Sequence, residues 1–205
     1  LNSLTGGAGS RGGILFNPGP PLDGVPTTSA LGSFADIQQV TDDMRNGRVE
    51  ALLIRGADPM YGTPASLAFE DASYNVPLIV SFAGRMDDTT AMSDLVLPQH
   101  DPLEDWGSDI PDPGPGYQMV GFQQPVVRPF FEHRGDHLGT KGFADVLLTV
   151  AQVLGMDLGL PGETFRDLLQ DGARQLYEKG SGTVTAPDFR TFWYGVLQRG
   201  VWGDV

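Results

Sequence analysis

Three short apolar runs, separated from one another by stretches with helical periodicity, constrain this chain more than any other feature. The runs cover residues 49–54, 76–82 and 95–97. Each has the length and the continuous apolar character of a strand that is buried on both faces. Alternation of such strands with helices requires crossover connections, which are right-handed and lead to parallel pairing. The sequence therefore predicts neighbouring parallel strands in a doubly wound, mainly parallel α/β sheet.

Helix signals lie on both sides of these runs. Apolar residues at helical spacing predict a helix over 34–46, with Ser33 as its N-cap and Gly47 just beyond its end. A second helix is expected to start near Pro64, since proline suits a first turn, and to run to about Ala72.

A short helix is expected to start within residues 87–90, whose Asp and Thr side chains can accept from free amides. Further along the chain, apolar periodicity predicts a helix from about Phe143 that Gly155 stops and another around residues 165–176. Pro187 is expected to open a last helix. The last two of these helices, after residue 155, form a C-terminal helical extension of the α/β domain.

We expect three regions along the chain: a linker over 1–32, a Rossmann-like α/β domain over 33–155 and the helical extension over 156–205. Residues 99–134 should be a long segment with little regular structure that contacts another polypeptide or another part of a parent chain, because loops of this length are usually functional or packed. This segment carries exposed aromatic residues that suit such a contact: Trp106, Tyr117, Phe122, Phe130 and Phe131.

The two ends of the chain suggest a piece of a larger protein. Residues 1–7 have the composition of the tail of a helix, and residues 202–205 follow the last predicted helix with no closing element. This is an expectation from composition and periodicity alone.

Composition narrows the classes of function. The net charge of −13 disfavours binding to nucleic acid and to anionic membrane surfaces, because like charges repel. The absence of cysteine excludes disulfides, cysteine-ligated iron–sulfur clusters and thiol catalysis within these 205 residues. No apolar run reaches the length of roughly 18 residues that a membrane span needs.

The histidines and tryptophans of the sequence give only weak evidence for a metal site or a stacking site. His133 and His137 have a spacing that could bind a metal on one helical face, but they lie in a loop-like region with Arg134 and Gly135 between them, which favours solvated loop residues. His100 stands apart from this pair. The three tryptophans are expected in a core or an interface rather than in a stacking platform: Trp106, Trp193 and Trp202.

The loops that follow the strands are the informative positions, because ligands of doubly wound sheets bind at the carboxyl edge of the strands. These loops cover residues 56–59, 81–90 and 98–107. A glycine directly after a strand lets the backbone approach a bound group, and amides at a helix N-terminus can bind a phosphate. Ordinary strand-to-helix turns explain the same residues, so spacing alone leaves both interpretations open.

Several of these segments, in this order, resemble the molybdopterin oxidoreductase (dimethyl sulfoxide reductase-like) family. Residues 1–14 resemble a helix end followed by a Gly-x-x-Gly-x-x-Gly-Gly turn, and residues 53–59 resemble a strand with a Gly-x-Asn-Pro loop in which Asp58 replaces the usual Asn. Residues 89–98 are similar to a Thr-Ala-x-x-Ala-Asp-x-x-Leu-Pro signature, and residues 104–107 to the Glu-x-x-Gly that follows it. Residues 124–129 and 145–148 continue the order.

The resemblance implies the third of four family domains, a Rossmann-like lobe that contacts one guanine-nucleotide half of a bis-pterin cofactor. If a pterin is bound, the residues that the resemblance implies at the cofactor are Gly56, Ala57, Asp58, Pro59, Asp87, Asp88, Thr89 and Thr90. No catalytic residue and no metal ligand is assigned to this chain, and the cluster cysteines and the metal ligand of the family lie in its other domains.

One departure from the family pattern concerns the guanine. Family members commonly place an Asp a few residues after the second strand, where a carboxylate can accept from the two adjacent N–H groups of the base. In this sequence the position is occupied by Ala83, with Phe82 and Gly84 beside it. The departure indicates that pterin binding is weakened or lost.

A pterin-free subgroup of the family shares the segments around Asp87 and Trp106 with this chain: the large iron–sulfur subunit of alternative complex III, a quinol-oxidising membrane complex. That resemblance implies a parent protein with iron–sulfur clusters and, in the cofactor-binding members, molybdopterin guanine dinucleotide. It implies iron–sulfur, cytochrome and membrane subunits of a respiratory or photosynthetic complex as partners, besides other segments of the same large subunit. The implied location is the periplasmic face of the bacterial cytoplasmic membrane.

Three interpretations remain open from the sequence. The first is a scaffold domain of an electron-transfer complex without pterin, which Ala83 and the acidic charge favour. The second is the cofactor-binding lobe of an active molybdenum bis-pterin oxidoreductase of the polysulfide or tetrathionate reductase type. The third is a stand-alone Rossmann-like binding protein.

Overall fold

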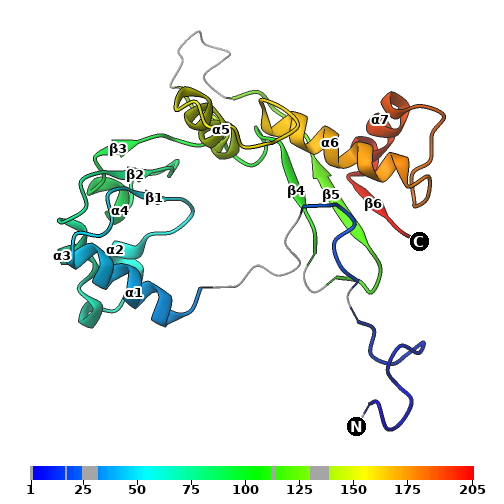
Figure 1. The fold of residues 1–205 in the computed structure, drawn as a ribbon, viewed down its shortest axis with the longest axis horizontal. Coiled ribbons are helices and arrows are strands. Elements are labelled where there is room, and N and C mark those ends of the chain that lie inside the picture. The colour runs from blue at the N-terminus through cyan, green and yellow to red at the C-terminus, as the bar shows by residue number, and fades with distance from the viewer. Residues whose placement is uncertain (1, 17, 25–31, 112–113, 130–138) are drawn as a thin grey trace. The chain divides into compact units, whose positions relative to one another are not determined.

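The computed structural model describes residues 2–16, 18–24, 32–111, 114–129 and 139–205 (Figure 1). Predictions that fall on Phe130, Phe131, His133 and His137 lie outside these residues.

The chain divides into two compact units. The parallel-sheet unit consists of Ala30–Glu104 and Val126–Leu147, and the antiparallel-sheet unit consists of Leu1–Ser29, Asp105–Pro125 and Leu148–Val205. The division of the chain into regions 1–32, 33–155 and 156–205 stays a prediction.

The predicted parallel strands are confirmed, but the expectation that they are buried on both faces is wrong for Leu53, Leu95 and Val96, which are exposed. The strands β1 (Leu52–Ile54), β2 (Ile79–Ser81) and β3 (Leu95–Val96) form one sheet in the order β1-β2-β3, and both pairings are parallel. The register places Leu53 beside Val80 and Val80 beside Leu95. All three strands therefore end at the same edge of the sheet, which is where the loops of the candidate site begin.

The helix α1 (Phe34–Arg45) confirms the first helix prediction, including both of its ends. The Ser33 hydroxyl accepts from the Asp36 amide, and the Asp36 carboxylate accepts from the Ser33 amide at 2.6 Å, which completes a capping box. Gly47 follows the helix with φ of 64°, a conformation that glycine adopts without steric cost.

The predicted helix over residues 65–72 is broken in the structure. A 3-10 turn η1 (Ala65–Leu67) and a short helix α3 (Phe69–Ser73) are separated by Ala68, whose φ of 48° is left-handed. Pro64 precedes the 3-10 turn and does not open an α-helix. Nothing in the sequence marks Ala68 as a left-handed residue. Apolar periodicity therefore predicted one continuous helix where the structure has the two short elements η1 and α3.

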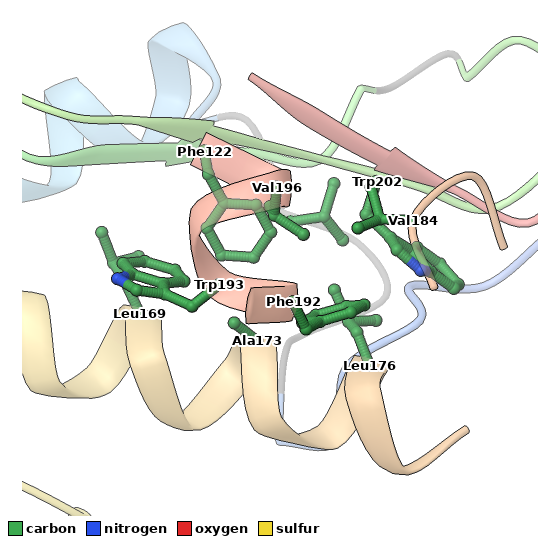
Figure 2. Packing of buried hydrophobic residues seen from close by; sticks show 10 residues of the cluster. Phe122, Leu169, Ala173, Leu176, Val184, Phe192, Trp193, Val196 and Trp202 are labelled. Carbon is green, nitrogen blue, oxygen red and sulfur yellow. The ribbon is translucent and has the colours of Figure 1, made fainter. Parts of the chain in front are cut away.

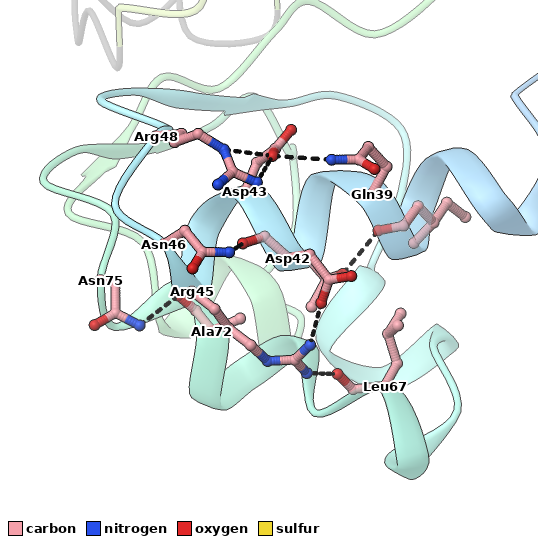
Figure 3. Close-up of polar contacts among 11 residues, drawn as sticks. Gln39, Asp42, Asp43, Arg45, Asn46, Arg48, Leu67, Ala72 and Asn75 are labelled. Carbon is pink, nitrogen blue, oxygen red and sulfur yellow. Dashed lines mark hydrogen bonds and ion pairs between the residues drawn. The ribbon is translucent and has the colours of Figure 1, made fainter.

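Polar contacts fix the end of α1 against this broken helix (Figure 3). The Arg45 guanidinium donates to the Leu67 carbonyl and to the Asp42 carboxylate, the latter at 2.7 Å. Beneath these contacts lies a core that α1 and α3 form with β1 and β2. Its buried members are Met44, Ile54, Leu67, Phe69, Ala72, Val76 and Ile79.

The antiparallel-sheet unit was not predicted. The strands β4 (Gly107–Asp109), β5 (Met119–Gln123) and β6 (Val201–Gly203) form a sheet in the order β4-β5-β6, and both pairings are antiparallel. The expectation of little regular structure over residues 99–134 is therefore wrong for β4 and β5. The expectation that the residues after the last helix form no closing element is also wrong, because β6 pairs with β5. Residues 2–6 form turns rather than the end of a helix.

Two helices cover this sheet with a shared apolar core (Figure 2). The helix α6 (Phe165–Glu178) starts at the Thr164–Asp167 capping box, and α7 (Phe189–Arg199) starts at the N-cap Asp188, one residue after the expected Pro187. The buried members of the core are Val120, Phe122, Leu169, Ala173, Leu176, Val184, Phe192, Trp193, Val196 and Trp202.

The aromatic residues of the core confirm one prediction and correct another. Trp193 and Trp202 are buried, as expected of core residues, and Trp106 stacks on Trp193 with ring centroids 6.1 Å apart. Phe122 was expected on an exposed segment, but it is buried and meets Trp193 edge-on at 5.8 Å. Packing inside the chain therefore accounts for Trp106 and Phe122 without an external partner.

Trp202 is the largest fully buried side chain of this core. Its indole N–H donates to the Ser181 carbonyl at 3.2 Å, and a Cβ on Gly182 would lie 2.5 Å from the indole ring. Only glycine fits at Gly182, which also has a φ of 96°. The turn before Val184 is thus shaped around the ring of Trp202.

Replacement of Trp202 by Ala is expected to lower the free energy of unfolding by about 3–5 kcal/mol, because it leaves a cavity and an unpaired carbonyl at Ser181. Urea unfolding followed by circular dichroism measures the change. The control Tyr194→Ala, on an exposed position of α7, should cost less than about 1 kcal/mol. Equal losses in the two variants would contradict the packing described for Trp202.

Candidate functional site

A cleft of about 360 Å³ opens at the carboxyl edge of the parallel sheet. It lies where β1 and β2 end, which is the edge where the sequence analysis expected a ligand, if one is bound. The residues that line it are Ile54, Gly56, Ala57, Asp58, Ser81, Ala83, Gly84, Arg85, Asp87 and Gln99.

Asp58 connects the loop after β1 to the short helix α4 (Asp88–Ala91). One oxygen of its carboxylate accepts from the Thr89 amide at 3.0 Å and from the Thr89 hydroxyl at 2.6 Å. The Thr89 hydroxyl in turn accepts from the amide of Met60, in the short helix α2 (Pro59–Gly62), at 3.1 Å. Thr89 is fully buried, and its hydroxyl both donates and accepts a hydrogen bond through these two partners.

The same contacts act on the charge of Asp58. Hydrogen bonds from the Thr89 hydroxyl, and then from backbone amides, stabilise the ionised form and hold the pKa of Asp58 below its usual value. Desolvation acts in the opposite direction but does not prevail. The carboxylate therefore stays charged at neutral pH.

Asp87 caps the start of α4, which confirms the predicted helix start. Its carboxylate accepts from the Thr90 amide at 2.7 Å. Behind it, the Thr90 and Ser81 hydroxyls are 2.8 Å apart and buried, and the Ser81 hydroxyl accepts from the Ala83 amide at 3.2 Å. These hydrogen bonds thus connect the start of α4 and the Ala83 amide, both beside the cleft, to Ser81 at the end of β2.

The predicted site residues lie at the same edge of the sheet, but only some of them line the cleft. The cleft is lined by Gly56, Ala57, Asp58 and Asp87. By contrast, Pro59 opens α2, Asp88 is exposed in the first turn of α4, and Thr89 and Thr90 are buried beneath the surface.

Gly56 has a φ of 66°, and a Cβ there would meet nothing within 4 Å. Glycine is therefore needed at this position for its backbone conformation rather than for space.

The sequence did not single out Arg85 and Gln99, although both lie in the loops expected to bind a ligand. Gln99 accepts from the Arg55 side chain at 2.7 Å, and the Arg55 guanidinium lies 4.8 Å from the ring of Phe143. Arg85 is exposed and makes no ion pair within the described part of the chain. Only the position of Arg85 after the second strand could have indicated it.

A second hollow of about 760 Å³ adjoins the cleft within the same unit and shares Gly84, Arg85 and Gln99 with it. His100 lines this hollow, and its Nδ1 lies 3.1 Å from the Thr140 hydroxyl. Among the described residues no group of His, Cys, Asp and Glu side chains could hold a metal ion.

The cleft does not fit an anionic guanine nucleotide. The amides at the start of α4, which a phosphate would need, already donate to carboxylates: Thr89 to Asp58 and Thr90 to Asp87. Asp58 and Asp87 outnumber the single guanidinium of Arg85 in the lining. At Ala83 the side chain offers no acceptor for the N–H groups of the base.

Replacement of Asp58 by Ala should lower the urea midpoint of unfolding at pH 7, because the Thr89 amide and hydroxyl lose their acceptor. The lowered pKa of Asp58 stabilises the folded state above the usual Asp pKa, and this contribution is lost as the pH falls through the lowered value. The difference in midpoint between wild type and Asp58→Ala should therefore shrink from pH 7 to pH 2.

The control Asp58→Asn keeps an acceptor oxygen but removes the titration. Its midpoint relative to Asp58→Ala should hardly depend on pH. A difference between wild type and Asp58→Ala that stays constant over this range would contradict the assigned contacts of Asp58.

Comparison with known proteins gives one informative similarity. The chain is 32% identical over 121 residues to the molybdopterin-binding-like subunit of menaquinone reductase from Nitratidesulfovibrio vulgaris. The match covers 59% of this chain and 16% of the relative, so the chain spans a small part of the relative's length. No family model matches the sequence. Across the described residues, no helix is both long and apolar enough to cross a membrane. The chain is thus distantly similar to a part of a molybdopterin-binding-like subunit of menaquinone reductase.

Proposed function

We propose that this chain forms a scaffold domain of a molybdopterin-oxidoreductase-like subunit in a quinone-reacting respiratory complex, and that it does so without binding a pterin. The similarity to a menaquinone reductase subunit supports the kind of complex. The observation that carries the pterin-free part is the occupation of the α4 amides by Asp58 and Asp87.

A bound nucleotide would displace hydrogen bonds that belong to the fold. A phosphate at the start of α4 would have to take the Thr89 and Thr90 amides from carboxylates that are part of the fold. The buried Thr89 hydroxyl, which also donates to Asp58, would then lose its acceptor, and a buried donor left unpaired costs about 1–3 kcal/mol. The displaced carboxylates would then stand beside the phosphates and repel them. The internal carboxylates thus replace the anion that a cofactor would supply.

The finer form of the proposal is the large iron–sulfur subunit of a complex of the alternative complex III type, which oxidises quinol. In that setting the partners are iron–sulfur, cytochrome and membrane subunits, and the location is the periplasmic face of the membrane. The clusters belong to parts of the subunit outside these 205 residues, which contain no cysteine. The contribution of this chain is then to hold neighbouring parts in place.

A second function has one observation in its favour. Arg85 lines both hollows and forms no ion pair with the described residues, and an arginine in that position suits a phosphate. The alternative is therefore the cofactor-binding lobe of an active molybdenum bis-pterin oxidoreductase of the polysulfide or tetrathionate reductase type.

Elemental analysis of the protein isolated from its own cells separates the two functions. The scaffold proposal predicts iron without stoichiometric molybdenum or tungsten and no guanine released on denaturation. Iron in the same sample serves as the internal control for protein loading. Stoichiometric molybdenum or tungsten, accompanied by guanine, would overturn the scaffold proposal and establish the cofactor-binding lobe.

A further inference from the structure

The end of α1 carries the only Asn-Gly pair of the sequence, Asn46-Gly47. An Asn before glycine is chemically reactive, because a backbone nitrogen whose residue has no Cβ can attack the side-chain amide without steric hindrance. In the described part of the chain, glycines with positive φ follow four helices: Gly47 after α1, Gly155 after α5 (Phe143–Val153), Gly180 after α6 and Gly200 after α7. The residue before the glycine is Asn only at α1, whereas it is Leu, Lys or Arg at the other three helices.

The reaction that this pair can undergo is deamidation, with water as the co-reactant. The Gly47 nitrogen attacks Cγ of Asn46 and closes a five-membered succinimide ring. The Nδ2 group leaves as ammonia and carries away the proton of the Gly47 amide. Water then opens the ring at either carbonyl, and the product is aspartate or isoaspartate at this position. No oxidant, reductant or metal takes part.

The structure holds the two reacting groups apart. Asn46 has a ψ of 9°, so the Gly47 nitrogen nearly eclipses the Asn46 nitrogen, whereas ring closure requires it to eclipse Cβ. The Asn46 side-chain amide donates to the Asp42 carbonyl at 2.6 Å (Figure 3). The Gly47 amide donates to the Met44 carbonyl at 3.0 Å. Cyclisation must therefore rotate the backbone at Asn46 and break both hydrogen bonds.

The last turn of α1 is fixed by its neighbours. Met44 is fully buried in the core beneath α1, and the Arg45 guanidinium donates to the Leu67 carbonyl and to the Asp42 carboxylate. A rotation at Asn46 requires this turn to open locally, and such openings have free energies set by the contacts that they break. The rate of deamidation should therefore depend on the contacts at the end of α1.

We propose that Asn46-Gly47 is a deamidation site and that the last turn of α1 protects it, so that modification follows local opening of this turn. The product cannot restore the closed turn. A carboxylate has no proton to donate to the Asp42 carbonyl, and its negative charge at the C-terminus of α1 opposes the helix dipole. Opening of the turn is thus converted into a permanent change. This proposal does not depend on whether the cleft binds a pterin.

Mass spectrometry of the protein isolated from its own cells tests the proposal. Folded protein and protein in urea are incubated at the same mildly alkaline pH, and peptides that contain Asn46 are scored for aspartate and isoaspartate over time. Modification should be roughly 5- to 150-fold slower in the folded protein, the factor that two hydrogen bonds account for. Equal rates in the two samples, or no modification in urea, would overturn the proposal.

Asn75 is the control within the same samples. Its side chain also donates to a carbonyl at a helix end, that of Ala72 at 3.3 Å, but Val76 follows it and its β-branched side chain hinders attack (Figure 3). Asn75 should stay unmodified in urea while Asn46 reacts. Modification of Asn75 as fast as that of Asn46 would contradict the role of Gly47.

The variant Arg45→Ala tests whether the contacts of α1 provide the protection. It removes the hydrogen bonds to Leu67 and Asp42, and it should raise the rate in the folded protein by about two- to tenfold while the rate in urea stays the same. The matched control Arg199→Ala removes an exposed arginine from the last position of α7 and should change neither rate. An unchanged rate in folded Arg45→Ala protein would refute the protection by α1.

Discussion

The hydrogen bonds from Thr89 to the Asp58 carboxylate are the contact on which the parallel-sheet unit depends at its functional edge. They join the loop after β1 to the helix after β2, through a threonine that is fully buried. The Met60 amide extends the connection to α2. Because Thr89 is buried and is bonded to both Asp58 and Met60, the loss of one partner leaves a buried group unpaired. The edge of the sheet is therefore held by the protein's own carboxylates.

This arrangement links the fold to the proposed function. Helix N-termini at the carboxyl edge of a parallel sheet are the places where α/β proteins bind phosphates. In this chain Asp58 and Asp87 take the amides of α4, and the position after β2 where a guanine acceptor was expected holds Ala83. The Thr89 and Thr90 amides at this edge are thus committed to contacts within the fold. This commitment is the basis of the supporting role without a cofactor that we propose for the chain.

Local signals in the sequence were sufficient for the parallel sheet and for the helix starts at Ser33 and Asp87, because apolar runs and capping residues act over a few positions. They were not sufficient for the antiparallel sheet, whose β5 and β6 pair across a large sequence separation. The alternation of Val120 and Phe122, both buried, was the available signal for β5. The loops that carry Asp58 and Thr89 were expected at the same edge of the sheet, but the contact between the two residues depends on tertiary structure.

The central claim is that the carboxylates of Asp58 and Asp87, and not a nucleotide, occupy the amides at the start of α4. An experimental structure of the protein isolated from its own complex, at a resolution that defines side chains, tests this directly. The account predicts the Asp58 carboxylate on the Thr89 amide and hydroxyl, the Asp87 carboxylate on the Thr90 amide, and no nucleotide density between Gly56 and Arg85. Nucleotide phosphates on those amides, with the two carboxylates turned away, would contradict it.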